Sequence, residues 1–230
     1  MKIEILEFQG GAEKARGVAV IIDVFRAFST ACYAVDSGAV RIIAAAGPEE
    51  AFRLKKNYHS SVLAGEKDEK KIDGFDFGNS PTEILKSDLR GMTMILTTTA
   101  GTKGLVNASD ADLILTGSLV NAGAVVRYIK ALNPNHVSLV AMGYRATSSA
   151  DEDLLCAELI ESRLKGTRGN FEKRINDLRL GAGQRFFNAE NLEFSPPTDY
   201  FLCTMTDRFD FILKGEKRFD GNIDLMRIDA

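Results

Sequence analysis

Several features are scarce in this chain, and each absence argues against a class of protein. No stretch approaches the roughly 18 uninterrupted apolar residues of a membrane-spanning helix. The start, "MKIEILEFQGG", carries charges within a short strand pattern and does not resemble a signal peptide. The three cysteines, Cys32, Cys156 and Cys203, are far apart and form no CxxC pair, which is typical of reduced, buried thiols. We therefore expect a cytoplasmic protein with no membrane partner.

An excess of positive charge is absent as well, and histidine is rare. The formal net charge is -3 and no basic stripe runs along the chain, so we expect no nucleic-acid partner. Of the two histidines, His59 and His136, each stands at the polar edge before a strand pattern, so we expect no histidine-centred mechanism. The motifs GxxxxGK[ST], GxGxxG and GxSxG do not occur. The sequence thus gives no support to a Walker site, a dinucleotide fold or an α/β-hydrolase serine.

Continuous apolar runs are present and alternate with helical patterns. Such runs suit strands that are buried on both faces, as in parallel sheets. The alternation predicts right-handed crossovers and a three-layer α/β/α fold with a mostly parallel sheet. No linker or repeat divides the 230 residues, so we expect one α/β domain over residues 1–230. The predicted strands are "VAVIIDVF", "RIIAAA", "SVLAGE", "TMILTTT", "DLILTG" and "VSLVAMG".

The last third of the chain is more polar and less regular than the rest. Here "FEKRINDLRLG" predicts a helix that ends at Gly181, and "YFLCTM" predicts a short strand or buried segment.

Polar residues follow the predicted strands, at the edge where this class of fold binds its ligands. Asp23 ends a buried strand, and Arg26 offers a guanidinium that can hold two phosphate oxygens at once. A simple Asp23–Arg26 pair, or a helix cap at Asp23, is the alternative. A haloacid-dehalogenase pattern requires a second aspartate two positions after the first, where this chain has Phe25, so that family is not indicated.

Two further strand exits carry the chemistry of an anion or metal site. The stretch "TTTAGTKG" (residues 97–104) places hydroxyl groups and glycine before a helix, where backbone N–H groups favour an anion; ordinary capping is the alternative. The stretch "SSADEDLLCAELIES" begins a helix with three acids. Capping explains most such acids, but the group also supplies the hard oxygen ligands that Mg²⁺ prefers.

The loop "KIDGFDFGNSPTEI" (residues 71–84) combines acidic residues, glycines and a helix start. Pro81 fits the first turn of a helix that Asn79 or Ser80 would cap, again with N–H groups facing an anion. We expect Asp76 to face the same crevice as Asp23. Lys70 and Lys71, where this loop begins, have a simpler interpretation as a solvated charge run.

Taken in order, these segments resemble the 2-phosphosulfolactate phosphatase family. The matching elements are "IIDVFRAFST", "AGEKDEKKIDGFDFGNSPTE", "LTTTAGT", "GSLVNAGAV" and "SADEDLLCAEL", of which the GFDxGNSP element is the most specific. The chain departs from the family pattern at Ala100, where the family usually has asparagine, and at Lys67, where arginine is common. The positions that match the family's pattern are Asp23, Arg26, Glu66, Asp76, Asn79, Ser80, Thr98, Thr99, Gly101, Thr102, Asn121, Glu152 and Asp153.

The resemblance implies an Mg²⁺-dependent phosphatase that converts 2-phosphosulfolactate to 3-sulfolactate and phosphate, on the route to coenzyme M. In this hypothesis Mg²⁺ is held by Asp23, Asp76 and Glu152 or Asp153. Arg26, Lys67 and the loop Thr98–Thr102, with Thr99 and Gly101, bind the phosphoryl oxygens. Asn79, Ser80 and Asn121 bind the sulfonate and carboxylate ends.

Two alternatives stay open at this point. One is a phosphatase of another small phosphorylated acid, and the other is a non-catalytic protein that binds an anionic metabolite in the same crevice. Water could attack phosphorus directly, or Asp23 could first become an aspartyl-phosphate. A homodimer is common among compact cytosolic enzymes, but the sequence does not fix the oligomeric state.

Overall fold

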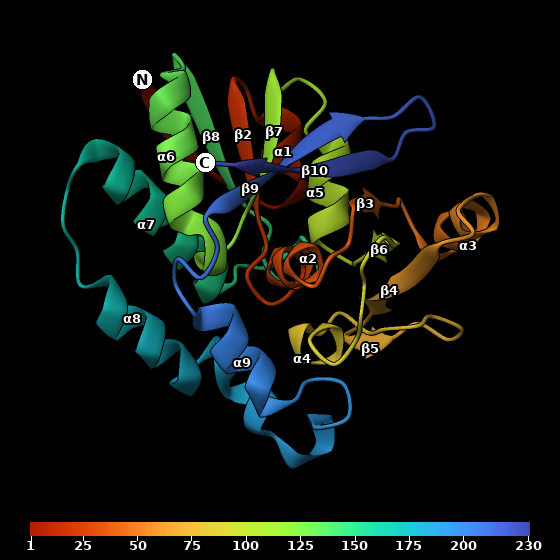
Figure 1. Ribbon diagram of the computed structural model, residues 1–230. Helices are drawn as coiled ribbons and strands as arrows, with labels where there is room; N and C mark the ends of the chain where they lie inside the picture. Colours follow the sequence, from red (N-terminus) through yellow and green to blue (C-terminus); the bar gives the residue numbers. More distant parts are fainter.

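A ten-stranded sheet runs through the molecule, which this computed structural model describes over residues 1–230 (Figure 1). The strand order is β1-β8-β2-β7-β9-β10-β3-β6-β4-β5. The strands are β1 (Lys2–Glu7), β2 (Val18–Ile22), β3 (Arg41–Ala44), β4 (Ser61–Lys67), β5 (Lys70–Lys71), β6 (Thr93–Thr97), β7 (Leu113–Gly117), β8 (His136–Ala141), β9 (Phe211–Lys217) and β10 (Ile223–Asp229).

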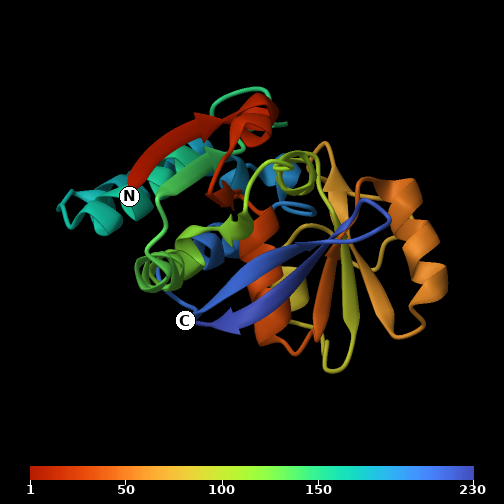
Figure 2. The same cartoon turned by 90° about the horizontal axis from the view of Figure 1, so that it is seen from above.

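The sheet consists of two parallel groups joined by an antiparallel hairpin. Strands β1, β8, β2 and β7 pair in parallel, and so do β3, β6 and β4. Hairpin β9–β10 pairs antiparallel with β7 on one side and with β3 on the other. Figure 2 shows this hairpin, in blue, crossing between the two groups. The predicted mostly parallel sheet is therefore confirmed, with an interruption at its centre.

Helices cover both faces of the sheet, which confirms the three-layer prediction. In β2, Ile21 packs into a core with residues of α1, α2 and α5, whereas Val20 and Ile22 pack into a second core with residues of α6 and α7. A smaller core lies between α3 and the strands β3, β4 and β6. No helix of this structure has the length and apolar character that crossing a membrane requires.

The two helix starts that the sequence marks most clearly, those of α4 and α7, are present. Ser80 caps α4 by accepting a hydrogen bond from the Glu83 N–H, with Pro81 in the first turn. Helix α7 has three acids in its first turn and ends at Gly166 in the left-handed conformation. The helices are α1 (Phe8–Lys14), α2 (Ala27–Asp36), α3 (Pro48–Asn57), α4 (Pro81–Ile84), α5 (Gly101–Asn107), α6 (Ala122–Leu132), α7 (Asp151–Lys165), α8 (Phe171–Asp177) and α9 (Pro197–Thr204).

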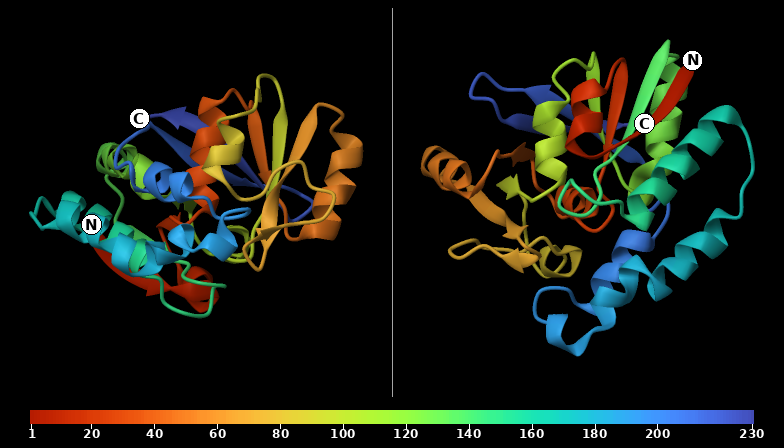
Figure 3. Two further views of the ribbon diagram at one scale, coloured as in Figure 1. Left: turned by 90° about the horizontal axis from the view of Figure 1, so that it is seen from below. Right: turned by 180° about the vertical axis from the view of Figure 1, so that it is seen from behind.

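The C-terminal third differs most from the sequence prediction. The segment "YFLCTM" is not a strand: its first five residues lie in α9, which buries Tyr200 and Cys203 against the second core. The hairpin β9–β10 was not predicted, because its strands mix charged and apolar residues and lack a continuous apolar run. Figure 3 shows that α8, α9 and the short 3-10 turns between them form a lobe on one side of the molecule.

Candidate active site

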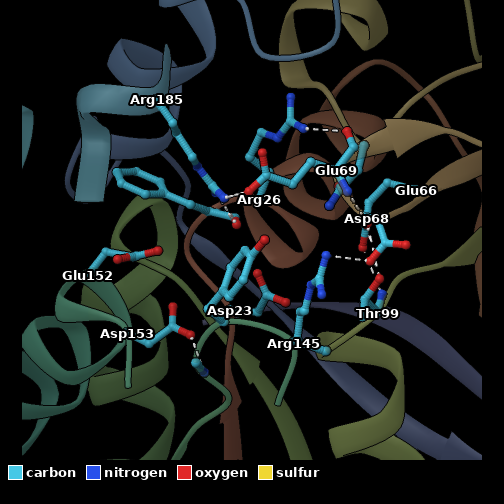
Figure 4. Close-up of a pocket in the computed structure, with 15 residues that line it drawn as sticks. Asp23, Arg26, Glu66, Asp68, Glu69, Thr99, Arg145, Glu152, Asp153 and Arg185 are labelled. Atoms are coloured by element: carbon cyan, nitrogen blue, oxygen red, sulfur yellow. Dashed lines mark hydrogen bonds and ion pairs between the residues drawn. The ribbon is translucent and has the colours of Figure 1, made fainter. Parts of the chain in front are cut away.

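A crevice opens where the carboxyl ends of β2, β4, β6 and β8 approach one another (Figure 4). It holds a space of about 550 Å³, counting the part that is open to solvent. Acidic and basic side chains dominate its walls, and only three of the fifteen lining residues are hydrophobic. The lining residues are Asp23, Phe25, Arg26, Glu66, Asp68, Glu69, Asn79, Thr99, Ala100, Gly143, Tyr144, Arg145, Glu152, Asp153 and Arg185.

Buried carboxylates form one wall of the crevice. Asp23 accepts a hydrogen bond from the Ala27 N–H through Oδ1, at 3.1 Å. Asp153 uses both oxygens for backbone groups: Oδ1 accepts from the Val24 N–H at 2.7 Å and Oδ2 from the Gly143 N–H at 2.9 Å. Asp153 thus ties the exit of β2 to the exit of β8. Glu152, one residue earlier, is also buried, and its Oε2 has no hydrogen-bond partner.

The pKa values of these three acids are raised, because the acids are buried and close to other negative charges. Burial raises the pKa of Asp23 to about 6, and the charge of Glu66 adds to the effect. Burial also raises the pKa of Glu152 to about 7, against the opposing effect of the Arg185 charge. The pKa of Asp153 lies well above its ordinary value because of burial and the negative charges of Asp23 and Glu152. A cation between them would relieve this repulsion.

The acids of this wall are hard oxygen donors, the kind that Mg²⁺ prefers. No three acidic, histidine or cysteine side chains converge as a ready-made cage. Mg²⁺, however, keeps several waters and takes only one or two carboxylates together with substrate oxygens. Two acids meet this requirement. Glu152 has an oxygen without a hydrogen-bond partner, and Asp23 has one oxygen that does not accept from the Ala27 N–H.

Arginines form the opposite wall. Arg26 is 3% exposed and donates from Nη1 to Asp199 Oδ2 at 2.7 Å. Arg185, on the 3-10 helix η3 (Ala182–Phe187), donates from Nη2 to the Phe25 carbonyl at 2.9 Å, and its Nε is buried without a partner. Arg145 forms a 2.7 Å ion pair with Asp68. In Figure 4 these side chains face the acids across the crevice.

The threonine loop contributes less than the sequence predicted. Thr99 lines the crevice, where its N–H donates to Glu66 Oε1 at 2.7 Å and its hydroxyl to Oε2 at 3.1 Å. Thr98 and Thr102 instead hydrogen-bond each other at the start of α5 and do not line the crevice. Gly101 lies behind Asp23, and a Cβ on it would come within 2.9 Å of Asp23 Oδ2. The absence of a side chain at Gly101 therefore leaves room for the Asp23 carboxylate.

The predicted position of Asp76 is wrong. Phe77 bridges to Ala64, so the loop runs alongside β4. Asp76 Oδ2 accepts from the Leu63 N–H at 2.7 Å and from Lys55 Nζ at 3.0 Å. It does not line the crevice.

The predicted position of Lys67 in the crevice is also wrong. Side chains alternate across a strand, so Lys67 points away from the crevice that its neighbour Glu66 faces. Lys67 is exposed on the β4–β5 hairpin.

Two residues that were predicted to bind the substrate, Ser80 and Asn121, lie outside the crevice lining and hold neighbouring segments in place. Ser80 caps α4 and donates to Asp199 Oδ1 at 2.8 Å. Asn121 completes a capping box with Ser118 through its Oδ1, at 3.1 Å. Neither lines the crevice. Asn79 does line it, and its Oδ1 is buried without a partner.

Sequence reasoning missed the residues that come from turns and from the C-terminal third. These are Asp68, Glu69, Arg145 and Arg185 in the lining, and Asp199 behind it. Arg145 lies in the segment between β8 and α7, shortly before the acidic helix start that the sequence does mark. Arg185 and Asp199 follow no predicted strand, so no local pattern pointed to them.

The fold and the crevice together define an α/β protein whose strand ends carry a site of buried carboxylates and arginines, suited to a small anionic ligand. The family model described as 2-phosphosulpholactate phosphatase matches residues 7–194. The chain belongs to the 2-phosphosulfolactate phosphatase family and is thereby a phosphoric monoester hydrolase.

Several relatives carry the description "Probable 2-phosphosulfolactate phosphatase". The protein from Caldanaerobacter subterraneus subsp. tengcongensis is 33% identical over 212 residues, which cover 85% of this chain and 86% of the relative. The protein from Carboxydothermus hydrogenoformans is 42% identical over 134 residues, covering 58% and 56%. The protein from Bacillus subtilis is 30% identical over 208 residues, covering 89% and 88%.

Proposed function

We propose that this protein is an Mg²⁺-dependent phosphatase that hydrolyses 2-phosphosulfolactate to 3-sulfolactate and phosphate, in the cytoplasm and on the route to coenzyme M. Family membership and the description of the relatives support the substrate. The observation that carries the chemistry is the crevice itself, where Asp23, Glu152 and Asp153 lie opposite Arg26 and Arg185. The substrate has three anionic groups, and such a ligand needs both a cationic wall and a metal site.

Asp23 and Glu152 are the residues that would hold Mg²⁺, because each has an oxygen that is not committed to a protein donor through the bonds described above. Bound Mg²⁺ offsets the charge of the phosphoryl oxygens and lowers the pKa of water. Asp153 takes a different role from the one predicted: with both oxygens bound to backbone N–H groups, it fixes the loops that present Asp23 and Gly143.

The guanidinium groups of Arg26 and Arg185 are the donors for the anionic ends of the substrate. Their charge stabilises the negative charge that develops on the phosphoryl oxygens during transfer. Asn79 and the Thr99 hydroxyl add neutral hydrogen-bonding groups at the same edge, where they can orient the carboxylate or sulfonate. Either water attack or attack by Asp23 is compatible with this arrangement.

An ester panel with and without Mg²⁺ tests the proposal. We expect phosphate release from 2-phosphosulfolactate that EDTA abolishes and that Asp23→Asn reduces by about 10²-fold or more. Preferred turnover of another phosphorylated acid would overturn the substrate, and full activity in EDTA would overturn the metal. Rapid acid quenching during turnover of ³²P-labelled substrate distinguishes the two modes of attack: covalent label on Asp23 requires the aspartyl-phosphate, and direct attack by water leaves the protein unlabelled.

A further inference from the structure

One carboxylate outside the crevice contacts two of the elements that form it. Asp199, in the first turn of α9, is completely buried and does not line the crevice. Its Oδ2 accepts from Arg26 Nη1 at 2.7 Å. Its Oδ1 accepts from the Ser80 hydroxyl at 2.8 Å and from the Thr82 N–H at 2.9 Å. Both oxygens are therefore used within the protein, and none is left for a ligand.

The contact with Arg26 sets the direction of a crevice guanidinium. Arg26 Nη1 is fully engaged, since it also donates to the Phe194 carbonyl at 2.6 Å. Nη2 has only a long contact of 3.4 Å, to the Glu69 carbonyl. The guanidinium is planar and its donors are fixed relative to one another, so holding Nη1 decides where Nη2 points. Asp199 thus leaves one edge of Arg26 for an anion in the crevice.

The contacts with Ser80 and Thr82 set the position of Asn79. They fix the start of α4 directly after Asn79, whose Oδ1 is buried in the crevice lining without a partner. Arg26 comes from the exit of β2 and Asn79 from the loop before α4, and the same carboxylate holds both segments. A buried charge pair of this kind adds little stability over apolar packing but can enforce one geometry.

We propose that Asp199 is a positioning residue of the phosphatase site: it holds Arg26 and Asn79 in the arrangement that binds the anionic substrate, without touching substrate itself. Asp199 lies outside residues 7–194, so the family match does not cover it. The inference rests on the proposed function for the identity of the substrate; the geometry of Arg26 and Asn79 does not depend on it.

Asp199→Asn is the informative substitution. Asparagine has one oxygen and one NH2 group: with its oxygen toward Ser80 and Thr82 it turns the NH2 group toward Arg26, and with the amide flipped it gives Arg26 a neutral oxygen but no longer accepts from the Thr82 N–H. We expect the dissociation constant for inorganic phosphate, measured by calorimetry with Mg²⁺ well below the unfolding temperature, to rise about ten- to hundredfold. The KM for 2-phosphosulfolactate should rise in parallel. Asp88→Asn, which changes an exposed aspartate paired with Arg90, is the matched control and should bind phosphate like the wild type.

Arg26→Gln and the double variant Arg26→Gln/Asp199→Asn complete the test. The double variant removes both buried charges together, so it leaves no uncompensated buried charge, and we expect it to be more stable than Asp199→Asn alone. If Asp199 acts through Arg26, the double variant binds phosphate no more weakly than Arg26→Gln. Both substitutions then remove the same interaction, the one between Arg26 and phosphate. Asp199→Glu restores the charge, and we expect it to recover part of the affinity.

Each other result contradicts a specific statement. Wild-type phosphate affinity in Asp199→Asn would overturn the positioning role and leave Asp199 a purely structural residue, and losses that multiply in the double variant would overturn the part of the role that runs through Arg26. Phosphate binding by the wild type without turnover of 2-phosphosulfolactate would overturn the proposed function alone. A wild-type protein that binds no phosphate would overturn both.

Discussion

Arg185 donates from Nη1 to Oε1 of Glu69 at 2.6 Å, which joins the C-terminal third of the chain to the β4–β5 turn across the crevice. Both side chains are about three-quarters buried, with exposures of 22% and 24%. Glu69 therefore occupies a guanidinium that an anionic substrate would also seek. If Arg185 binds the substrate as proposed, the carboxylate of Glu69 competes with the substrate for this guanidinium.

Glu69→Gln should strengthen the binding of phosphate. The amide keeps the size of the side chain but removes the charge that competes for Arg185, so we expect the dissociation constant for phosphate to fall about two- to fivefold. Arg185→Gln should have the opposite effect and lower kcat/KM by about 10²- to 10³-fold. Calorimetry and steady-state kinetics measure the two effects. Weaker phosphate binding in Glu69→Gln would show that the pair supports the site rather than competing with substrate.

Gly101→Ala should damage activity and also lower stability. The added Cβ would lie 2.9 Å from Asp23 Oδ2 and 2.9 Å from the Ala27 Cβ, so both residues must move. A displacement of about 1 Å in a site costs up to about 10²-fold in rate. Because Ala27 is buried and its Cβ cannot swing aside, we expect overpacking to lower the free energy of unfolding by about 1–3 kcal/mol. Gly10→Ala in α1, where nothing lies within 4 Å, is the matched control and should keep full activity.

The stability of the metal-free protein should fall as pH rises from 5 to 8. The raised pKa values of Asp23 (about 6) and Glu152 (about 7) mean that the folded state binds more protons than the unfolded state over this range. Stability is then highest below the ordinary carboxyl pKa and is lost as pH rises through the folded values. A tenfold difference in proton affinity between the folded and unfolded states corresponds to about 1.4 kcal/mol.

Thermal unfolding across this pH range, in EDTA, measures the effect. Asp23→Asn and Glu152→Gln should each flatten the profile, because the substituted amide does not titrate. Mg²⁺ should raise the unfolding temperature more at pH 8 than at pH 5, since protons compete for the same oxygens. A profile that rises toward pH 8 in the metal-free wild type would contradict the raised pKa values.

Lys67→Ala and Asp76→Asn should leave catalysis intact. Lys67 is exposed and faces away from the crevice, and Asp76 is bound to Lys55 and to the backbone of β4. We expect kcat and KM within about twofold of the wild type for both, in line with substitutions away from a site. Loss of activity in Lys67→Ala would restore the role that the sequence predicted for this residue.

The fold and one wall of the crevice were predictable because their signals are local. A buried apolar run followed by a polar residue marks a strand and its carboxyl end, and this pattern alone indicates Asp23, Thr99 and Glu152 as candidates. The rule that parallel strands present these ends to ligands then brings them together. The sequence nevertheless predicted too many ligands in the threonine loop. Thr98 and Thr102 hydrogen-bond each other: the Thr98 hydroxyl accepts from the Thr102 N–H, and the Thr102 hydroxyl donates to the Thr98 carbonyl.

The rest depends on contacts between distant parts of the chain. Arg185 reaches the crevice, and Asp199 lies behind it, only because the lobe of α8 and α9 packs against the second core. The sequence around these two residues has no strand and no motif. Asp76 was misplaced because the bridge of Phe77 to Ala64 is a long-range pairing that no spacing reveals. Lys67 was misplaced for a simpler reason: alternation along β4 turns it away once Glu66 faces inward.

The central position of hairpin β9–β10 has a consequence for how the site assembles. The two parallel groups, which carry Asp23 on one side and Glu66 and Thr99 on the other, are joined within the sheet only by residues 211–229. Pairings between segments so distant in the sequence form slowly. The two halves of the crevice therefore come into register only when the hairpin pairs with β7 and with β3.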